Sequence, residues 1–351
     1  MKHFEFTGLP WNVIFGAGAV KQTPQILADF GFRRTLILST PGRTSNVETL
    51  QSVLGNCVAG TFTGAAVHVP AGIVAEVRRA AKDCGADCTI SIGGGSTTGL
   101  GKLLRLEAGL PQIAIPTTYA GSEMTPIWGV TEGTIKRTGR DPRVLPAAVI
   151  YDPQLLLSLP PAVAGPSALN AMAQAIANVS AHPVAGLLAR EALRVLAEGL
   201  PRVMDHIDNV EAQADMLYGA CLAGAALGLG KSGLHHRICH VLGGVYNLPH
   251  AETHAVILPY SVAFIARTAP EESEMVAAAL GARNAAVRLH EMMRQVCARQ
   301  SLKAFGLSLA DLDAVAAEAT LTPISGAPEV TRAGVRQLLG NAFEGNPPSV
   351  K

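Results

Sequence analysis

The sequence has few charged residues and no excess of either sign, which excludes several classes of protein. Only 16% of its 351 residues are charged, and the formal net charge is +1. A surface that binds nucleic acid or a membrane by charge needs clustered basic residues, and a disordered chain is usually richer in charge. The composition therefore predicts a compact enzyme with a small-molecule ligand and with no nucleic-acid or membrane partner.

The chain also lacks a disulfide framework and a long apolar run. Its six cysteines are scattered, and the closest pair, Cys84 and Cys88, is separated by three residues rather than the two of a zinc ribbon. The segment Met1–Glu5 has no apolar stretch of a secretory signal, and no later run reaches ~18 apolar residues. We expect reduced thiols and a soluble, cytoplasmic protein.

The length fits two domains, which we place at residues 1–157 and 158–351. Up to about Pro160, short apolar runs rich in β-branched residues alternate with helical segments, a pattern typical of a parallel, doubly wound α/β sheet. The predicted strands are Asn12–Phe15, Thr35–Ser39, Thr61–Thr63, Cys88–Ile92, Ile113–Pro116 and Ala148–Tyr151. The predicted helices between them are Val20–Phe30, Val47–Leu54, Ala71–Cys84 and Thr97–Leu106.

The second half shows only amphipathic helical periodicity and predicts an all-α domain. Its predicted helices are Ala168–Ser180, Val184–Leu200, Val210–Leu227, Ala285–Phe305, Leu309–Ala319 and Arg332–Ala342. The segment Thr322–Val330, with two prolines and a glycine, is predicted to be a loop.

Three glycines at 93–95 follow a predicted buried strand and open a helix. Backbone N–H groups at a helix start can approach a pyrophosphate closely, and the hydroxyls of Ser96 and Thr97 would add donors. The spacing is not G-x-G-x-x-G, and a glycine triplet alone is equally typical of a tight turn. The strand-to-helix setting favours a nucleotide site.

Other polar or glycine residues follow neighbouring strands. Thr117, Thr118 and Ser122 stand after one strand and could bind a ribose, a phosphate or a carboxamide, although helix capping is the plain alternative. The strand ending at Ser39 and Thr40 lacks the acid that selects NAD, and Arg43 is nearby, so NADH or NADPH is expected. The predicted cofactor-binding residues are Gly16, Ser39, Thr40, Gly93, Gly94, Gly95, Ser96, Thr97, Thr117, Thr118 and Ser122.

Five of the ten histidines lie within twenty residues: His235, His236, His240, His250 and His254. On a helix, His236 and His240 would share one face, and the glycine and proline break before His250 could fold it back toward them. Such a cluster indicates a functional site, while buried or capping histidines are the structural alternative.

Asn170 and Gln174 show the same i, i+4 spacing at the start of the second domain. Amides bind divalent transition metals poorly compared with imidazole, thiolate or carboxylate. Taken alone, these two residues would be assigned to helix capping or surface solvation.

Taken together, these motifs resemble the iron-containing alcohol dehydrogenase superfamily, which shares the dehydroquinate synthase-like fold. The resemblance covers the whole chain in order: Gly-Gly-Gly-Ser at 93–96, Pro-Thr-Thr at 116–118, and His236-x-x-x-His240 before Pro249-His250. Metal-binding members have Asp-x-x-x-His and then two further histidine ligands, at the positions that here hold Asn170, Gln174, His236 and His250. The resemblance implies that half of the ligand set is replaced, and no metal is expected.

Further segments, including Leu-Pro-His-Ala-Glu-Thr-His at 248–254 and Gly99 in place of a common Asp, resemble the maleylacetate reductases. That family reduces the carbon–carbon double bond of maleylacetate to give 3-oxoadipate with NADH or NADPH in the catabolism of aromatic compounds. The resemblance implies the same reaction here, and a homodimer.

A conjugated enone accepts hydride at the carbon β to its ketone, so an enolate oxygen must be stabilised and a proton delivered. His236, His240 and His250 are the candidates for these catalytic roles, with His236 as the favoured acid or oxyanion donor. Asn170, Gln174 and His254 are predicted to contact the dicarboxylate substrate. Tyr119, Lys231, Arg237 and Lys136 could pair with its carboxylates, although for Lys136 a surface hairpin is the alternative.

Two other functions are open to this sequence. The first is a metal-dependent alcohol or polyol dehydrogenase that binds its ion through two histidines and substitute ligands. The second is a non-catalytic nucleotide-binding relative, in which metal ligands have been lost, although the intact histidine cluster argues against it.

Overall fold

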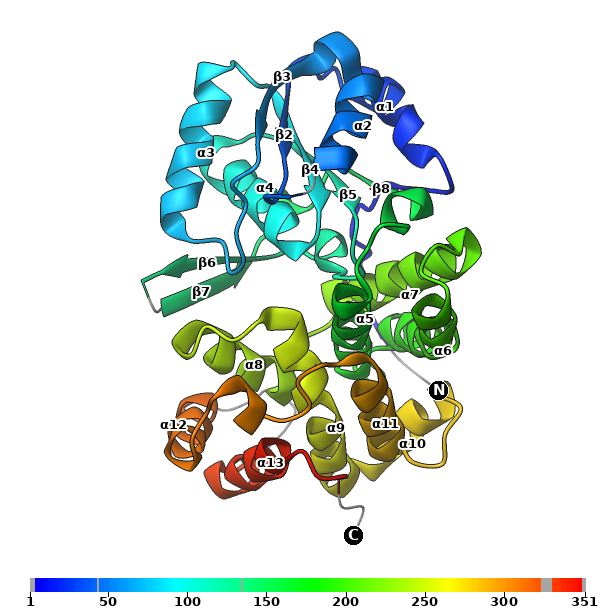
Figure 1. Ribbon diagram of the computed structural model, residues 1–351, viewed down its shortest axis with the longest axis vertical. Coiled ribbons are helices and arrows are strands. Elements are labelled where there is room, and N and C mark those ends of the chain that lie inside the picture. The colour runs from blue at the N-terminus through cyan, green and yellow to red at the C-terminus, as the bar shows by residue number, and fades with distance from the viewer. Residues whose placement is uncertain (1–3, 43, 134, 323–329, 349–351) are drawn as a thin grey trace.

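The computed structural model of the protein describes residues 4–42, 44–133, 135–322 and 330–348. An α/β region at the top of Figure 1 rests on a helical region below it. The sheet strands end at Tyr151 and the first long helix of the lower region begins at Pro161. Arg43 and most of the predicted loop Thr322–Val330 lie outside the described residues.

The α/β region is built on a six-stranded parallel sheet with the order β1-β8-β5-β4-β2-β3. Its strands are β1 (Val13–Phe15), β2 (Thr35–Leu38), β3 (Val58–Phe62), β4 (Cys88–Gly93), β5 (Gln112–Pro116) and β8 (Ala148–Tyr151). Every residue of β2, β4, β5 and β8 is buried. The predicted parallel sheet is therefore confirmed, and its apolar strands are those of a sheet covered on both faces.

Four helices cover this sheet: α1 (Thr23–Asp29), α2 (Thr44–Leu54), α3 (Ala71–Asp83) and α4 (Gly95–Ala108). Successive side chains of a strand point to opposite faces. Ile37 of β2 accordingly packs in the cluster that contains α1 and α2, while Leu36 and Leu38 pack with α3 and α4.

The chain runs from β2 outward to β3 and then returns to β4 on the other side of β2. Such a reversal leaves a crevice at the carboxyl ends of the two strands, where open α/β sheets bind ligands. The ends of β2, at Leu38, and of β4, at Gly93, flank this crevice.

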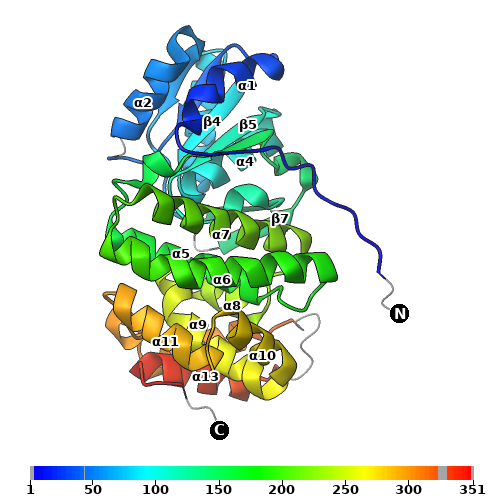
Figure 2. The ribbon, with the colours of Figure 1, turned by 90° about the vertical axis from the view of Figure 1, so that its right-hand side faces the viewer.

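The helical region is assembled around α5 (Pro161–Ile176), whose residues from Ala164 to Ile176 are all buried. The other helices are α6 (Pro183–Asp205), α7 (Val210–Leu229), α8 (Leu234–Val245), α9 (His250–Thr268), α10 (Pro270–Ala279), α11 (Ala285–Val296), α12 (Leu309–Ala319) and α13 (Arg332–Glu344). Figure 2 shows α5, α6 and α7 stacked beneath the sheet. Among the described residues, no helix combines the length and apolarity needed to cross a membrane. The predicted all-α architecture of this half is confirmed.

Several elements differ from the sequence-based prediction. The strand predicted at Thr61–Thr63 begins earlier, at Val58, and the helices α8, α9 and α10 were not among those predicted. The helix expected at Ala285–Phe305 ends at Val296, where the side chain of Gln300 donates hydrogen bonds to the carbonyls of Arg294 and Cys297 and the chain turns extended. A two-stranded antiparallel hairpin, β6 (Ile127–Glu132) and β7 (Ile135–Arg140), also projects from the α/β region above α8.

Candidate active site

The start of α4 offers free backbone donors at the carboxyl edge of the sheet. Its N-cap is Gly94, in an extended conformation, and no side chain caps the first turn. Uncapped N–H groups at a helix start carry partial positive charge and bind phosphate groups. This part of the structure therefore fits the pyrophosphate of a dinucleotide.

The glycines of this turn are required by space as well as by conformation. Gly93 has φ +148°, and a Cβ atom there would lie 2.8 Å from the Thr97 Oγ1 atom. A Cβ atom on Gly94 would lie 3.0 Å from the Thr118 Oγ1 atom. The backbone of the turn thus packs directly against the side chains of Thr97 and Thr118. Larger residues at 93 and 94 would block a ligand from the N–H groups.

The predicted hydroxyl residues differ in what remains available to a ligand. Thr97 donates to the Gly94 carbonyl at 2.8 Å, so its hydroxyl holds the turn itself. The Thr117 hydroxyl is buried and has no hydrogen-bond partner. Ser96, Thr118 and Ser122 are half-buried near the same edge. An unpaired buried hydroxyl is costly, so Thr117 is the strongest candidate among them for a ligand contact.

The Gly16 turn is organised by the protein itself. The Gly16 N–H donates to the Tyr151 carbonyl. The Asp152 carboxylate accepts from the N–H groups of Gly18 and Val20, at 3.0 and 3.1 Å. Because Asp152 already occupies these donors, this helix start does not offer a second phosphate site.

At the end of β2, Ser39 is buried and Thr40 is half-buried. The Ser39 N–H donates to the Phe62 carbonyl, and its hydroxyl points to the Thr40 carbonyl at 3.4 Å. Thr40 is therefore the more accessible of the two for a ribose. No acidic side chain stands at this strand end in the sequence from Thr35 to Gly42.

The start of α4 and the loop 117–122 form a candidate nucleotide-binding region, called the nucleotide edge below. Lys102 of α4 supports this edge from inside, and the sequence alone did not point to it. Its ammonium group is fully buried and donates to the carbonyls of Ser122, Thr125 and Ile127 at 2.6, 2.8 and 2.8 Å. Burial lowers its pKa to about 7, partly opposed by the buried carboxylate of Glu123. Lys102 thus fixes the loop after β5, which carries Thr117, Thr118 and Ser122.

The five clustered histidines come together between α8 and α9, as predicted from their spacing. Their ring centroids lie 5.4 Å apart for His235 and His236, 6.5 Å for His236 and His240, and 4.4 Å for His250 and His254. Three of the rings, those of His235, His236 and His254, are buried. The break at residues 246–249 does return His250 to the other four.

The hydrogen bonds in this cluster are unevenly distributed. The Nε2 atom of His235 lies 2.9 Å from the Nδ1 atom of His254, and its Nδ1 atom lies 3.0 Å from the Ser261 hydroxyl. Both ring nitrogens of His236 and the Nε2 atom of His254 are buried without a partner. Polar atoms left unpaired in this way are candidates for direct contact with a ligand.

Burial keeps these imidazoles neutral in the unliganded protein. It lowers the pKa of His236 to about 4 and that of His250 to about 3, and it holds the pKa values of His235, His240 and His254 well below 6.5. The charge of Lys136 adds to the effect on His240 and His250. A ligand with negative charge would oppose both effects.

Asn170 and Gln174 of α5 are buried, so they are not surface residues. The Gln174 amide donates to the Ala120 carbonyl at 2.6 Å and thereby ties α5 to the loop after β5. The Gln174 Oε1 and Asn170 Oδ1 atoms have no partner. Two buried, unpaired acceptors on one helix indicate that this face of α5 is part of a ligand site.

The donors at the positions of the family's metal ligands do not fit a transition-metal ion well. They are two amides and two neutral imidazoles, and none carries the negative charge that a carboxylate ligand brings. A different group of residues, His235, Cys239 and His254, has better ligand chemistry and is buried. Its two imidazole nitrogens are 2.9 Å apart, whereas two nitrogens on one tetrahedral Zn²⁺ lie roughly 3.3 Å apart. The shorter distance is that of a hydrogen bond.

A cleft of ≈ 710 Å³ lies beside the cluster, between the hairpin and α8. His68, Thr131, Gly243 and Asn247 are among the residues that line it. The three described non-glycine residues with positive φ are His68, Val69 and Asn247, so backbone strain is concentrated around this cleft.

His68 crosses from the α/β region to the histidine cluster, although nothing in its sequence context marks it. Its Nε2 atom lies 3.3 Å from the Leu248 carbonyl, and its ring is 6.3 Å from that of His250. Lys136, on β7, is also close enough for its charge to lower the pKa of His68, after the larger effect of burial. Lys136 is thus both a hairpin residue and a neighbour of the cluster.

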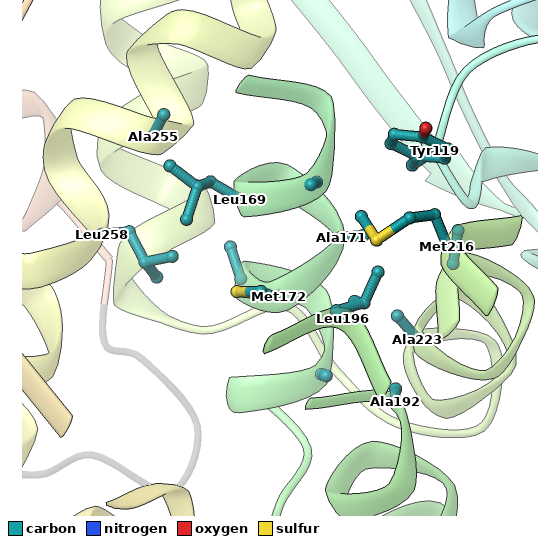
Figure 3. Close-up of a cluster of buried hydrophobic side chains, with 14 of the residues drawn as sticks. Tyr119, Leu169, Ala171, Met172, Ala192, Leu196, Met216, Ala223, Ala255 and Leu258 are labelled. Carbon is teal, nitrogen blue, oxygen red and sulfur yellow. The ribbon is translucent and has the colours of Figure 1, made fainter. Parts of the chain in front are cut away.

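Three predicted substrate contacts are engaged elsewhere. The Tyr119 hydroxyl donates to Gln213 Oε1, and its ring packs in the core with Met216, as Figure 3 shows. Arg237 donates to the carbonyl and hydroxyl of Thr322. Lys231 is exposed, and its N–H donates to Asn178. The side chains of Tyr119 and Arg237 therefore bond to residues outside the cluster, and that of Lys231 lies at the surface.

Comparisons with known proteins agree with this geometry. The family model described as iron-containing alcohol dehydrogenase matches residues 10–153, and that described as the C-terminal part of the Fe-containing alcohol dehydrogenase family matches residues 164–343. A maleylacetate reductase of Sphingobium indicum is 43% identical over 98% of this chain and 99% of its own length. Maleylacetate reductase 2 of Cupriavidus pinatubonensis is 45% identical over 97% and 96%. The crystal structure of maleylacetate reductase from Agrobacterium tumefaciens is 42% identical, with a TM-score of 0.92 over 99% of this chain and 100% of that one.

Proposed function

Since this chain belongs to the iron-containing alcohol dehydrogenase family, we propose that it reduces the carbon–carbon double bond of maleylacetate with NADH or NADPH, giving 3-oxoadipate. The observation that carries the proposal is the buried His236, with both ring nitrogens unpaired, together with the unpaired amide oxygens of Asn170 and Gln174 at positions where metal-binding relatives have ligands. The similarity to maleylacetate reductases over nearly the whole chain supports the same substrate.

The cofactor is proposed to lie in the crevice at the ends of β2 and β4. The N–H groups at the start of α4 would bind its pyrophosphate, Thr40 its ribose, and Thr117 a further polar group. When bound, the dihydronicotinamide supplies a hydride. With no acid at the end of β2, the site accepts a ribose with or without a 2′-phosphate.

The substrate is proposed to bind between this crevice and the histidine cluster. Hydride addition to the carbon β to the ketone moves an electron pair onto the ketone oxygen, and the resulting enolate takes a proton at the α carbon. His236, with His240 and His250, is proposed to stabilise the oxygen and to supply that proton. The carboxylates of the substrate raise the pKa of these imidazoles and so favour the charged, donating form.

Lys136 is the proposed partner of one carboxylate, since its charge reaches His240 and His250. The Gln174 NH2 group donates one of its two hydrogens to Ala120, and its Oε1 atom is unpaired, like the Oδ1 atom of Asn170. We therefore assign these two oxygens to contacts with donors, such as a protonated imidazole or a carboxamide.

We also propose that the reaction needs no catalytic metal. The neutral donor set at residues 170, 174, 236 and 250 supports this, because it lacks an anionic ligand for a Lewis-acid ion. The chain is further proposed to act as a cytoplasmic homodimer, with residues 1–157 and 158–351 as its domains.

The purified chain should oxidise NADH or NADPH when maleylacetate is added, with 3-oxoadipate as the product. Its activity should persist in a strong chelator, and simple alcohols and aldehydes should not replace the substrate. Activity on alcohols that disappears with a chelator, together with a stoichiometric metal, would identify a metal-dependent dehydrogenase instead. Failure to oxidise either cofactor would favour a non-catalytic relative.

A further inference from the structure

Four groups between α8 and α9 form a continuous row of hydrogen bonds that ends inside the histidine cluster. The Ser261 hydroxyl donates to the Leu258 carbonyl at 2.8 Å. The Nδ1 atom of His235 lies 3.0 Å from Ser261 Oγ, and the Nε2 atom of His235 lies 2.9 Å from His254 Nδ1. The row ends at the Nε2 atom of His254, which is buried and has no partner.

The direction of this row follows from counting hydrogens. Ser261 has a single hydroxyl hydrogen, and the Leu258 carbonyl takes it, so Ser261 Oγ must accept from a protonated His235 Nδ1. A neutral His235 then has a lone pair on Nε2, which accepts from His254 Nδ1. The Cys239 thiol lies 3.8 Å from the same Nε2 atom. It is a weak donor, so it is compatible with a lone pair on that nitrogen.

We propose that Ser261 and His235 are positioning residues, which hold His254 in the tautomer with a protonated Nδ1 and a lone pair on Nε2. This lone pair then accepts a hydrogen bond from His236 in its charged form, leaving the other N–H group of His236 for the substrate. The tautomer stands on the geometry alone, and only the link to proton delivery rests on the proposed function.

The positions of the rings support His236 as the partner. The ring centroids of His236 and His254 are 5.2 Å apart at an interplanar angle of 67°. The hydrogen-bonded pair His235 and His254 has nearly the same arrangement, with 4.9 Å and 61°. Both nitrogens of His236 are unpaired, so a rotation of its ring that aims one of them at His254 Nε2 would complete the bond.

The lone pair of His254 Nε2 would help a buried imidazole to carry a positive charge. An imidazole can serve as an acid only when both nitrogens carry hydrogens, and that charged form is disfavoured by burial. A lone pair aimed at one N–H group stabilises the charged form and orients the other N–H group. The opposite tautomer of His254 would present a hydrogen to His236 and would oppose its charging.

The first test measures the tautomer in the wild-type chain. In enzyme labelled with ¹⁵N-histidine, the His254 signals, identified by their loss in His254→Gln, should show a protonated Nδ1 and an unprotonated Nε2. A protonated Nε2 atom would overturn the proposal, whatever the activity. A maleylacetate assay that fails while this tautomer is found would contradict the proposed function and leave the positioning of His254 intact.

The second test removes the far end of the row. Ser261→Ala should shift His254 away from the single tautomer and lower kcat about ten-fold, as for the loss of one buried hydrogen bond, with KM within about two-fold. Ser261→Thr keeps the hydroxyl and should restore both readouts. Thr268→Val, which removes a hydroxyl from the same helix far along from the cluster, is the control for helix stability.

A matched pair at His235 separates positioning from packing. His235→Gln keeps an acceptor for His254 Nδ1 and should retain more activity than His235→Leu, which has none. Equal tautomers and equal kcat in the wild type and Ser261→Ala would overturn the proposal. So would a stoichiometric metal in the purified protein that is lost in Cys239→Ala, since His235 and His254 would then be ligands.

Discussion

The nucleotide edge of the α/β region and the histidine cluster of the helical region are built on opposite principles. The edge is made largely of backbone: an uncapped helix start and two glycines, Gly93 and Gly94, where a Cβ atom would crowd a threonine side chain. The buried Lys102 holds the adjoining loop. The cluster is made of side chains, and several of its buried nitrogens lack partners. One part offers N–H groups held in a fixed shape, and the other keeps ionisable groups buried and unpaired.

Because of this difference, different changes should impair the two sites. A phosphate site made of N–H groups has no side chain to delete, so it is damaged by adding atoms. An imidazole site in a dry interior is damaged by removing atoms or by adding protons. Mutations and pH can therefore address the two regions separately.

The largest effect is expected from His236→Ala, which removes the proposed acid from the cluster. Turnover should fall roughly 10²-fold or more, as is usual for the loss of a general acid. Steady-state kinetics with saturating cofactor measure the change. His290→Ala is the matched control, because His290 is also a buried histidine but bonds to Gly345 outside the cluster. Near-wild-type turnover of His236→Ala would remove His236 from the mechanism.

As the pH falls, the helical region around the histidine cluster should lose stability before the sheet does. The folded pKa of His236 is about 4, below the ordinary 6.5, so its stabilising effect is complete above pH 6.5 and is lost as the pH falls toward 4. Each such histidine lowers the free energy of unfolding by up to about 1.4 kcal/mol per pH unit in that window.

Hydrogen exchange between pH 7 and pH 5, corrected for the intrinsic rates, would locate this loss. Amides of α8 and α9 should lose more protection than those of β4 and α4, and His236→Gln should reduce the difference. Equal losses of protection in both regions would show that protonation of the buried histidines does not destabilise the helical region selectively.

Gly94→Val should weaken cofactor binding at the nucleotide edge, because it adds side-chain atoms there. The new side chain would meet Thr118, where a Cβ atom alone comes within 3.0 Å, and it would cover the N–H groups of α4. The KM for NADH should rise about ten-fold, corresponding to a modest overpacking cost. Gly72→Ala in α3 has nothing within 4 Å and should leave the KM unchanged. An unchanged KM in Gly94→Val would place the pyrophosphate elsewhere.

The smallest effect is expected at the ribose position. Thr40→Asp places a carboxylate at the end of β2, where it repels a 2′-phosphate and can accept from a 2′-hydroxyl. The ratio of kcat/KM for NADPH to that for NADH should fall about ten-fold. Thr40→Asn has nearly the same shape without the charge and should leave the ratio close to that of the wild type. An unchanged ratio in Thr40→Asp would show that the ribose does not reach this residue.

Predictions from local pattern succeeded where burial is continuous. The strand Ala148–Tyr151 and the helix Leu309–Ala319 were predicted at their exact bounds, because their apolar spacing alone distinguishes them. The return of His250 to the other histidines was also predictable from the break before it. The positions of Tyr119 and Arg237 were not, since their partners Gln213 and Thr322 are 94 and 85 residues away.

The sequence by itself determined the alternating strands and helices of the first half, the glycine turn and the histidine cluster, while the replacement of two metal ligands by amides came from the family resemblance. These follow from residue identity and short-range spacing, which tertiary contacts do not change. Only the tertiary structure decided that Lys102 supports the nucleotide edge, that His68 reaches the Leu248 carbonyl 180 residues away, and which nitrogens of the cluster remain unpaired. Burial and hydrogen-bond satisfaction depend on groups that only the folded chain brings together, and these two properties set the chemistry of the site.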